Sequence, residues 1–239
     1  MPDTPNDART LAANLRGRFI VFDGPDGSGK STQRRMMADY LTSGGGEVVS
    51  CRDPGGTEIG DRIRSVLLDF DLGKMDVNCE TLLFMASRAQ LVAEVVRPAL
   101  NAGRIVLCDR FVTSTCAYQG AAGYNVERVI ELARFAIGDS WPHLTVLFDV
   151  DVETGFKRIG RTAAHAGKNR AKSDTGATLF EDALPDAMEA RSIEFHRKVR
   201  RLFLEVGAVY PTEVVTVDGT GAPDVVHQRA LECMARVAH

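Results

Sequence analysis

Residues 24–31 read Gly-Pro-Asp-Gly-Ser-Gly-Lys-Ser, which satisfies the pattern G-x-x-x-x-G-K-[ST]. The preceding residues 18–22 (RFIVF) form a short apolar run that indicates a buried strand. The following residues 32–41 place apolar side chains at helical spacing and indicate a helix. Glycines between a strand and a helix let backbone N–H groups turn inward around an anion, at the positive end of the helix. The stretch therefore predicts a phosphate-binding loop.

Side chains of this loop fit the chemistry of a nucleoside triphosphate. Lys30 is expected to reach the β- and γ-phosphates, and the Ser31 hydroxyl to ligate Mg²⁺. Glycine-rich turns also join strands to helices without binding anything, but the complete pattern in its strand and helix context favours nucleotide binding. The predicted ATP-binding residues are Gly24, Pro25, Asp26, Gly27, Ser28, Gly29, Lys30, Ser31 and Thr32.

The composition of the chain excludes some classes of binding partner and some cellular locations. A formal net charge of −3 argues against a protein whose main task is gripping nucleic-acid phosphates. The five cysteines are odd in number and never in C-x-x-C spacing, so buried thiols in a reducing cytoplasm explain them better than disulfides or a metal site. No hydrophobic signal segment opens the chain, and no run approaches the roughly 20 apolar residues of a membrane span. We expect a cytoplasmic protein without membrane contact.

Short apolar runs alternate with longer amphipathic stretches along the chain. The predicted strands are 18–22, 47–51, 104–109, 144–150 and 214–218, and the main later helices are 80–100, 126–138, 186–205 and 223–237. Continuous hydrophobicity within the strands indicates burial on both faces, which is typical of a parallel sheet covered by helices on each side. We therefore predict one α/β domain over residues 17–239, preceded by a loose extension over residues 1–16.

Residues 158–184 break this pattern, because basic side chains lie among Gly, Ala and Ser with little periodicity. Most basic runs are solvated surface loops. In an enzyme that transfers phosphate, a basic loop can also act as a lid over the reacting phosphates. We favour the lid.

Further charged residues follow the predicted strands, where ligands collect in parallel sheets. Asp109 ends the third strand and could hold Mg²⁺. Alone, any arginine on these segments is more often part of a surface ion pair. Together they suggest a second anionic group, the phosphate of an acceptor; these arginines are Arg52, Arg64, Arg88 and Arg110.

Four motifs in one order make the chain resemble thymidylate kinase, the dTMP kinase of bacteria. The first is the phosphate loop with its flanks, FDGPDGSGKST at 22–32. The others are RDPGGT at 52–57, LLFMASR at 82–88, and DRF at 109–111 with AYQG at 117–120. The last two are far more specific than the phosphate loop. The resemblance runs from about residue 18 to the end of the chain and is interrupted mainly in the predicted lid.

The resemblance implies a nucleoside-monophosphate-kinase fold with a five-stranded parallel sheet, and transfer of the γ-phosphoryl group of ATP to dTMP with Mg²⁺. It implies that thymine stacks on Phe84, since a flat apolar ring suits a flat base. Tyr118 would pack under the sugar and disfavour a 2′-hydroxyl, and Asp26 would bind the 3′-hydroxyl. The implied dTMP-binding residues are Asp26, Arg52, Arg64, Phe84, Arg88, Arg110, Thr115, Tyr118 and Gln119. The implied metal ligands are Ser31 and Asp109, and the family also implies a homodimer.

The chain departs from the family in the lid. One class of the family carries a catalytic arginine in the phosphate loop, where this chain has Gly27, so the lid should supply the cation. The short lid motif of the family is not recognisable. Arg158 and Arg161 are therefore the candidate catalytic cations beside Lys30 and Arg110. Lys168 and Arg170 are the second-choice candidates for this cation.

Two other functions remain open from the sequence. One is a kinase of the same fold with another nucleotide or nucleoside as acceptor, which Phe84, Arg88 and the Tyr118-Gln119 pair disfavour. The other is a nucleotide-binding switch that has lost catalysis with its altered lid. The transfer residues are intact, which disfavours a pure binder.

Overall fold

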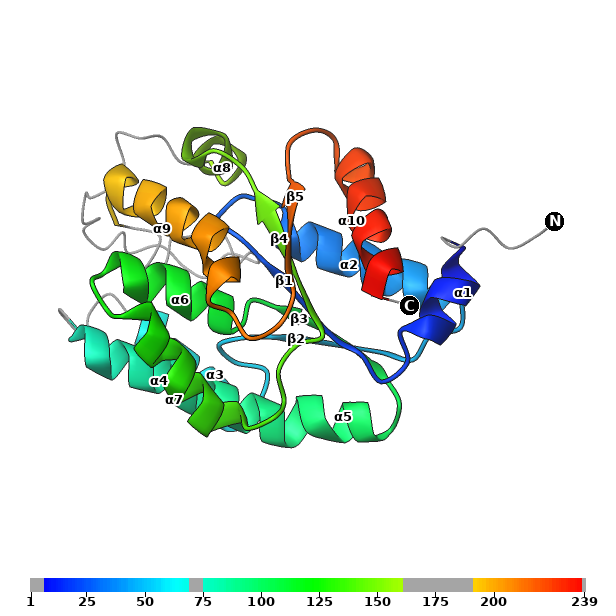
Figure 1. The fold of residues 1–239 in the computed structure, drawn as a ribbon, viewed down its shortest axis with the longest axis horizontal. Helices are drawn as coiled ribbons and strands as arrows, with labels where there is room; N and C mark the ends of the chain where they lie inside the picture. Colours follow the sequence, from blue (N-terminus) through cyan, green and yellow to red (C-terminus); the bar gives the residue numbers. More distant parts are fainter. Residues whose placement is uncertain (1–6, 69–74, 161–190, 238–239) are drawn as a thin grey trace, which may run out of the picture.

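A parallel five-stranded sheet in the order β2-β3-β1-β4-β5 runs through the middle of the protein (Figure 1). The computed structural model describes residues 7–68, 75–160 and 191–237. The strands are β1 (Phe19–Asp23), β2 (Val48–Arg52), β3 (Ile105–Asp109), β4 (Leu144–Asp149) and β5 (Val214–Asp218). The prediction of five strands is confirmed, and each predicted boundary lies within one residue of the observed one.

Helices cover both faces of the sheet (Figure 1). They are α1 (Ala8–Asn14), α2 (Lys30–Ser43), α3 (Glu58–Leu68), α4 (Val77–Leu91), α5 (Arg97–Asn101), α6 (Val112–Ala121), α7 (Val126–Ile137), α8 (Val152–Arg158), α9 (Ile193–Glu205) and α10 (Pro223–Val237), with a π turn at η2 (Val92–Val96) and a 3₁₀ turn at η3 (Val206–Ala208). Successive strand residues point to opposite faces. Ile20 accordingly joins the apolar cluster of α1, α2 and α10, while Val21 joins that of η2, α6 and α7.

The helix predicted over 80–100 is longer and less regular than expected. It begins at Val77, because Asp76 caps it by accepting a hydrogen bond from the Asn78 backbone N–H. The helix widens into η2 before Pro98, which lacks the N–H that an α-helix needs at that position. The helix predicted over 186–205 is described from Ile193, after its Ser192 cap.

The N-terminal segment corrects one prediction. Residues 1–16 were expected to be a loose extension, but residues 8–14 form α1, capped by the Asp7 side chain. Leu11 and Leu15 are completely buried against α2 and the sheet. The physical cause is that two leucines four residues apart are too short a pattern to stand out in a polar segment, although packing against the rest of the protein stabilises a short helix.

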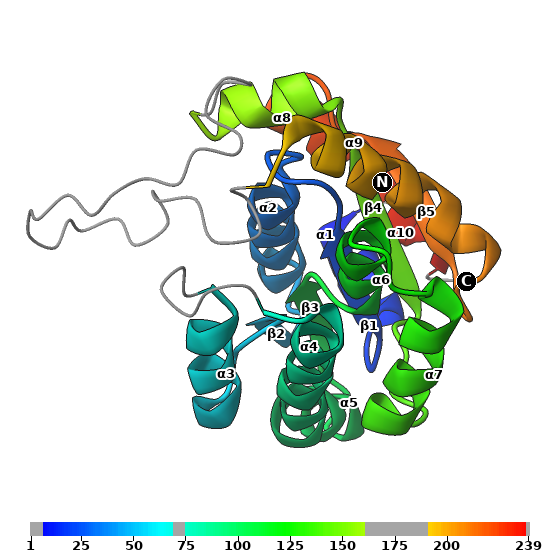
Figure 2. The ribbon, with the colours of Figure 1, turned by 90° about the vertical axis from the view of Figure 1, so that its left-hand side faces the viewer.

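The carboxyl ends of β1, β2 and β3 meet at one edge of the sheet, where α2 begins between α8 and α3 (Figure 2). Ligands collect at this edge in parallel α/β sheets. All five cysteines are free, and four are buried as predicted, whereas Cys79 on α4 is exposed. Among the described helices, none is long and apolar enough to cross a membrane.

Candidate active site

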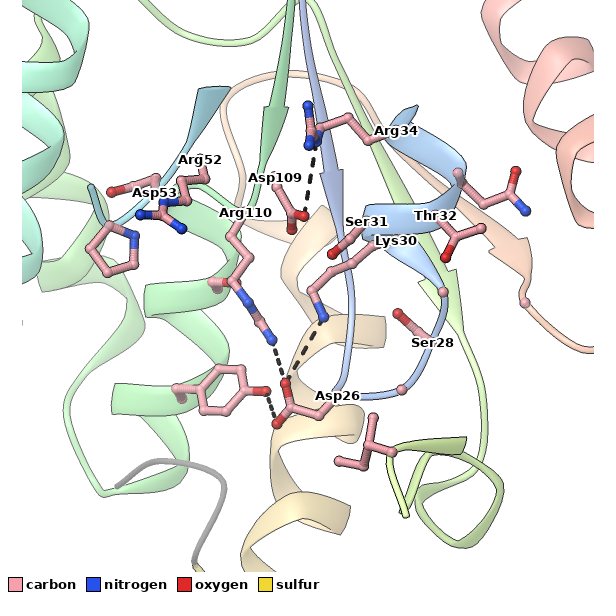
Figure 3. A pocket seen from close by; sticks show the side chains of 18 of the residues that line it. Asp26, Ser28, Lys30, Ser31, Thr32, Arg34, Arg52, Asp53, Asp109 and Arg110 are labelled. Atoms are coloured by element: carbon pink, nitrogen blue, oxygen red, sulfur yellow. Dashed lines mark hydrogen bonds and ion pairs between the residues drawn. The ribbon is translucent and has the colours of Figure 1, made fainter. Parts of the chain in front are cut away.

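A pocket of about 760 Å³ opens at the carboxyl edge of the sheet (Figure 3). One wall is the phosphate loop and the start of α2. The opposite wall comes from the ends of β2 and β3 and from α3, α4 and α6. The pocket brings together all nine residues predicted to bind dTMP, and also Ser31, Asp109 and Arg158.

The phosphate loop holds a backbone shape that only glycine adopts easily. Gly24, Gly27 and Gly29 have φ angles of 141°, 73° and 92°. A Cβ at Gly27 would lie 2.1 Å from the carbonyl oxygen of Gly155 on α8. The loop therefore rests directly on the backbone of α8, and no side chain fits between them.

Lys30 folds back over this loop. Its Nζ donates to the Pro25 carbonyl at 3.3 Å and lies 3.9 Å from the Asp26 carboxylate. Burial, followed by the neighbouring Arg110, lowers the pKa of Lys30, and the nearby aspartates only partly offset this. The ammonium group is thus already inside the pocket at the level of the loop, where a phosphate would stabilise its charge.

Asp26 is the hub of the pocket (Figure 3). Arg110 donates to one carboxylate oxygen, and the Tyr118 hydroxyl donates to the other at 2.7 Å. The Nδ1 atom of His196 on α9 lies 3.8 Å from the Asp26 oxygen that Tyr118 contacts. His196 was not among the predicted site residues. Burial alone raises the pKa of Asp26, but Arg110, Lys30 and Tyr118 outweigh it and lower the pKa to about 2. Asp26 is therefore a stable carboxylate that can accept hydrogen bonds.

Arg110 is held in an uncommon conformation directly after β3. Its φ of 66° is left-handed, which is rare for residues other than glycine and tends to occur at functional sites. The side chain lies over the Tyr118 ring and donates to Ser114 at 3.1 Å. The strained backbone thus aims the guanidinium from the strand end at the phosphate loop.

Arg88 is buried and fixed by protein partners. Its Nε donates to Asp53 at 2.6 Å, and another nitrogen donates to the Phe111 carbonyl and to the Thr115 hydroxyl at 2.9 Å. Burial raises the pKa of Asp53 in spite of Arg88. These contacts fix the orientation of Arg88 where it meets the pocket.

The remaining predicted acceptor residues come from α3, α4, α6 and the end of β2. Gln119 is fully buried and donates to Glu80 at 2.9 Å. Arg52 pairs with Asp61 at 3.3 Å, and Arg64 donates to the Pro54 carbonyl at 3.1 Å.

Ser31 and Asp109 present a hydroxyl and a carboxylate to the same pocket. Oxygen donors of this kind suit Mg²⁺, which commonly takes few protein ligands and completes its shell with phosphates and water. The donor set therefore fits a metal ion carried largely by the nucleotide.

Arg158 is the one lid candidate within the described residues. It donates to the Gly27 carbonyl at 3.3 Å and to the Gly219 carbonyl at 3.0 Å, so it joins α8 to the phosphate loop. Arg161, Lys168, Arg170 and the other predicted lid residues from 161 onward lie outside the described part of the chain.

Sequence reasoning missed the role of Asp23 and the pairing of Asp53 with the predicted residue Arg88. Asp23 is completely buried at the end of β1 and accepts hydrogen bonds from Thr113, from Ser114 at 2.6 Å and from the Gly24 N–H at 2.8 Å. Its place directly before the glycine-rich pattern was a usable signal. The Asp53–Arg88 pair spans 35 positions and left no local signal.

A parallel sheet of this order, a phosphate loop and a facing basic pocket define the class: the protein is a P-loop nucleoside monophosphate kinase. Residues 22–230 match the sequence profile of the family described as Thymidylate kinase. The chain belongs to the thymidylate kinase family.

Individual relatives agree with this assignment. The chain is 38% identical to a thymidylate kinase of Bacillus velezensis over 219 residues, which cover 91% of this chain and 95% of the relative. It is 41% identical to one of Pelobacter propionicus over 213 residues, covering 89% and 91%. The crystal structure of thymidylate kinase from Ehrlichia chaffeensis is similar with a TM-score of 0.66 at 28% identity, covering 91% of this chain and 98% of that one.

Proposed function

We propose that this protein transfers the γ-phosphoryl group of ATP to the 5′-phosphate of dTMP, giving dTDP and ADP. The observation that carries the proposal is the pocket in which the phosphate loop, with Asp26, faces the other eight residues of the implied dTMP site. The catalytic domain is taken as residues 17–239, with α1 packed on it.

The donor half binds ATP mainly through backbone. Backbone N–H groups of residues 26–32 surround the phosphates, since Pro25 has no N–H and the Gly24 N–H donates to Asp23, and Lys30 adds a charge that spans the β- and γ-phosphates. Ser31 and Asp109 would hold Mg²⁺, which supplies charge neutralisation on the transferring phosphoryl group. The contact of Arg158 with Gly27 places one further cation beside the loop.

The acceptor half orients dTMP. Phe84 offers a ring for the base, and Tyr118 packs under the sugar, with its hydroxyl bonded to Asp26. The Asp26 carboxylate accepts a hydrogen bond from the 3′-hydroxyl of dTMP. The acceptor phosphate lies between Arg52, Arg64 and Arg110, where forked donors suit phosphate oxygens.

The reaction then needs alignment rather than a protein base, because the attacking 5′-phosphate oxygen is already anionic. Transfer in line requires that this oxygen face the γ-phosphorus while cations neutralise the spreading charge. Lys30 and Arg110 both approach the same carboxylate oxygen of Asp26, so both can reach a phosphoryl group between the two halves (Figure 3). Arg158 and Arg161 complete the proposed set of catalytic cations and would help exclude water as part of the lid.

The decisive experiment measures ADP formation with ATP and Mg²⁺ across a panel of acceptors: dTMP, dUMP, dCMP, dGMP, AMP and UMP. Strong turnover with dTMP supports the proposal. Preference for another acceptor contradicts the roles of Phe84 and Arg88, and ATP binding without turnover contradicts enzymatic activity.

The proposal includes a homodimer in the cytoplasm. The exposed apolar side chains on α3, α4 and α7 support association and include Ile59, Val66, Leu82 and Phe135.

A further inference from the structure

Arg34 is a cation beside the predicted metal site that the mechanism above does not use. It lies on α2, one helical turn after Lys30. Its Nε is 4.0 Å from a carboxylate oxygen of Asp109. The same Nε is buried and makes no hydrogen bond within the described residues. A buried N–H is thus directed at a carboxylate without being satisfied by it, which costs free energy unless the charge has another use.

Asp109 differs from two neighbouring aspartates, Asp26 in the pocket and Asp23 at the end of β1. Asp23 and Asp26 accept hydrogen bonds from side chains, whereas among the described contacts the Asp109 carboxylate accepts none. Arg34 holds it by charge alone. The oxygens of Asp109 therefore stay open to a metal ion, and no hydrogen bond has to break when the ion arrives.

The charges around Asp109 favour one form of the metal. In Figure 3 Asp109 lies between Arg34 on one side and the Lys30 and Arg110 side chains on the other. Lys30 and Arg110 already lie beside the Asp26 carboxylate, so a bare divalent cation at Asp109 would meet the charge of Arg34 above all. A metal that arrives on a triphosphate carries a net negative charge into the same field, so the interaction changes from repulsion to attraction.

We propose that Arg34 makes the metal site selective for nucleotide-bound metal: it positions the Asp109 carboxylate and repels free divalent cations. The inference rests on the proposed function, because it uses the assignment of Asp109 as a metal ligand. It adds a residue and a property, the rejection of free metal, to that assignment.

Binding of free Mn²⁺ tests this without any turnover. Electron paramagnetic resonance counts unbound Mn²⁺ in titrations of the full-length protein without nucleotide, at low and at high salt. The protein is compared with Arg34→Gln and Arg34→Met, which remove the charge, and with Arg34→Lys, which keeps it. Arg35→Gln is the matched control, since Arg35 is the exposed neighbour on the same helix. Asp109→Asn tests the metal ligand itself.

Removing the Arg34 charge should tighten free Mn²⁺ binding about tenfold at low salt, with a smaller gain at high salt because ions screen the repulsion. Arg34→Lys should bind Mn²⁺ as the unaltered protein does, and Arg35→Gln should change the affinity less than about twofold. Equal Mn²⁺ affinity in the unaltered protein and both neutral variants overturns the proposal. A gain that does not depend on salt also overturns it, because a purely structural change would behave in that way.

Asp109→Asn separates this inference from the proposed function. Suppose that Asp109→Asn loses Mn²⁺ binding and that the neutral Arg34 variants gain none. The role of Arg34 in repelling free metal is then rejected, whereas the assignment of Asp109 as a metal ligand stands. Unchanged Mn²⁺ binding in Asp109→Asn rejects the metal assignment itself.

Discussion

The two halves of the pocket are built from different parts of the chain. The proposed donor half is one continuous stretch, the phosphate loop and the start of α2, whose shape depends on three left-handed glycines, and its residues from Asp26 to Thr32 line the pocket. The proposed acceptor half is made of side chains from the end of β2, from α3, α4 and α6, and from Arg110 after β3, and Asp26 of the phosphate loop joins it through Arg110 and Tyr118. Phosphate can be bound by backbone alone, whereas a base, a sugar and a second phosphate need specific side chains.

This difference predicts that damage to one half leaves binding at the other half nearly intact. The largest effect is expected from Arg110→Ala, which removes both a phosphate ligand and the partner of Asp26. We expect kcat/KM for dTMP to fall about 1,000-fold while KM for ATP changes little. Steady-state kinetics with each substrate varied in turn measures this. Because a lower kcat affects kcat/KM for both substrates, only KM separates the halves, and an equal rise in KM for dTMP and ATP would mean that they are not separate.

Gly27→Ala should damage the donor half in the converse way. The new Cβ would meet the Gly155 carbonyl at 2.1 Å in a left-handed backbone, so the loop must shift. We expect kcat/KM for ATP to fall about 100-fold, while dTMP binds as before in calorimetry. Ser28→Ala is a suitable control, because it keeps the backbone shape. Normal ATP kinetics in Gly27→Ala would refute the role given to the backbone.

Arg88→Met should show that the acceptor half is also part of the protein core. The change leaves the buried Asp53 without its ion-pair partner, and we expect a loss of about 3 kcal/mol in the free energy of unfolding. Urea denaturation measures it. Adding Asp53→Asn should restore part of the loss, because the uncompensated carboxyl group is then gone. No recovery in the double variant would indicate that lost packing, rather than charge, causes the effect.

Leu11→Ala should lower stability without touching either half. Leu11 of α1 is completely buried, so we expect a loss of about 2 to 3 kcal/mol in the free energy of unfolding. The exposed Asn14 of the same helix provides the control variant Asn14→Ala. KM for both substrates should stay unchanged in Leu11→Ala. A shift in either KM would connect α1 to the pocket.

The smallest effect is expected at the amino edge of the sheet, opposite the pocket. There His143 Nδ1 accepts a hydrogen bond from the Phe19 N–H at 3.0 Å. Burial, followed by Arg18, lowers the pKa of His143 from 6.5. The unfolded chain therefore takes up this proton more readily, so the stability contributed by neutral His143 is present above pH 6.5 and is lost as the pH falls through 6.5 toward the lowered pKa.

Denaturation at pH 7.5 and 5.5 checks this, with His143→Asn as the comparison. The unaltered protein should lose more stability between these two conditions than the variant does. An equal loss of stability in the unaltered protein and in His143→Asn would show that His143 does not cause the pH dependence. KM should stay the same in both proteins, since the residue is remote from both halves.

What the sequence could predict follows the same division. The sheet and the phosphate loop were predictable because each is a local pattern of apolar runs and glycines. The side chains that support the acceptor half were not, since pairs such as Asp53 and Arg88 meet only after folding. The resemblance to a family supplied the nine acceptor residues, and the pocket contains all of them. Helix α1 was not predicted, because two buried leucines are too weak a pattern to indicate a helix.

Calorimetric titration of dTMP into the protein without ATP shows whether the acceptor half binds its nucleotide independently of the donor half. Because Asp26, Arg110 and Tyr118 hold one another in place through hydrogen bonds within the protein, we expect saturable binding of dTMP alone, much weaker binding of dCMP, and loss of dTMP binding in Arg110→Ala. Binding of dTMP only after an ATP analogue has been added, or equal binding of dTMP and dCMP, would contradict it.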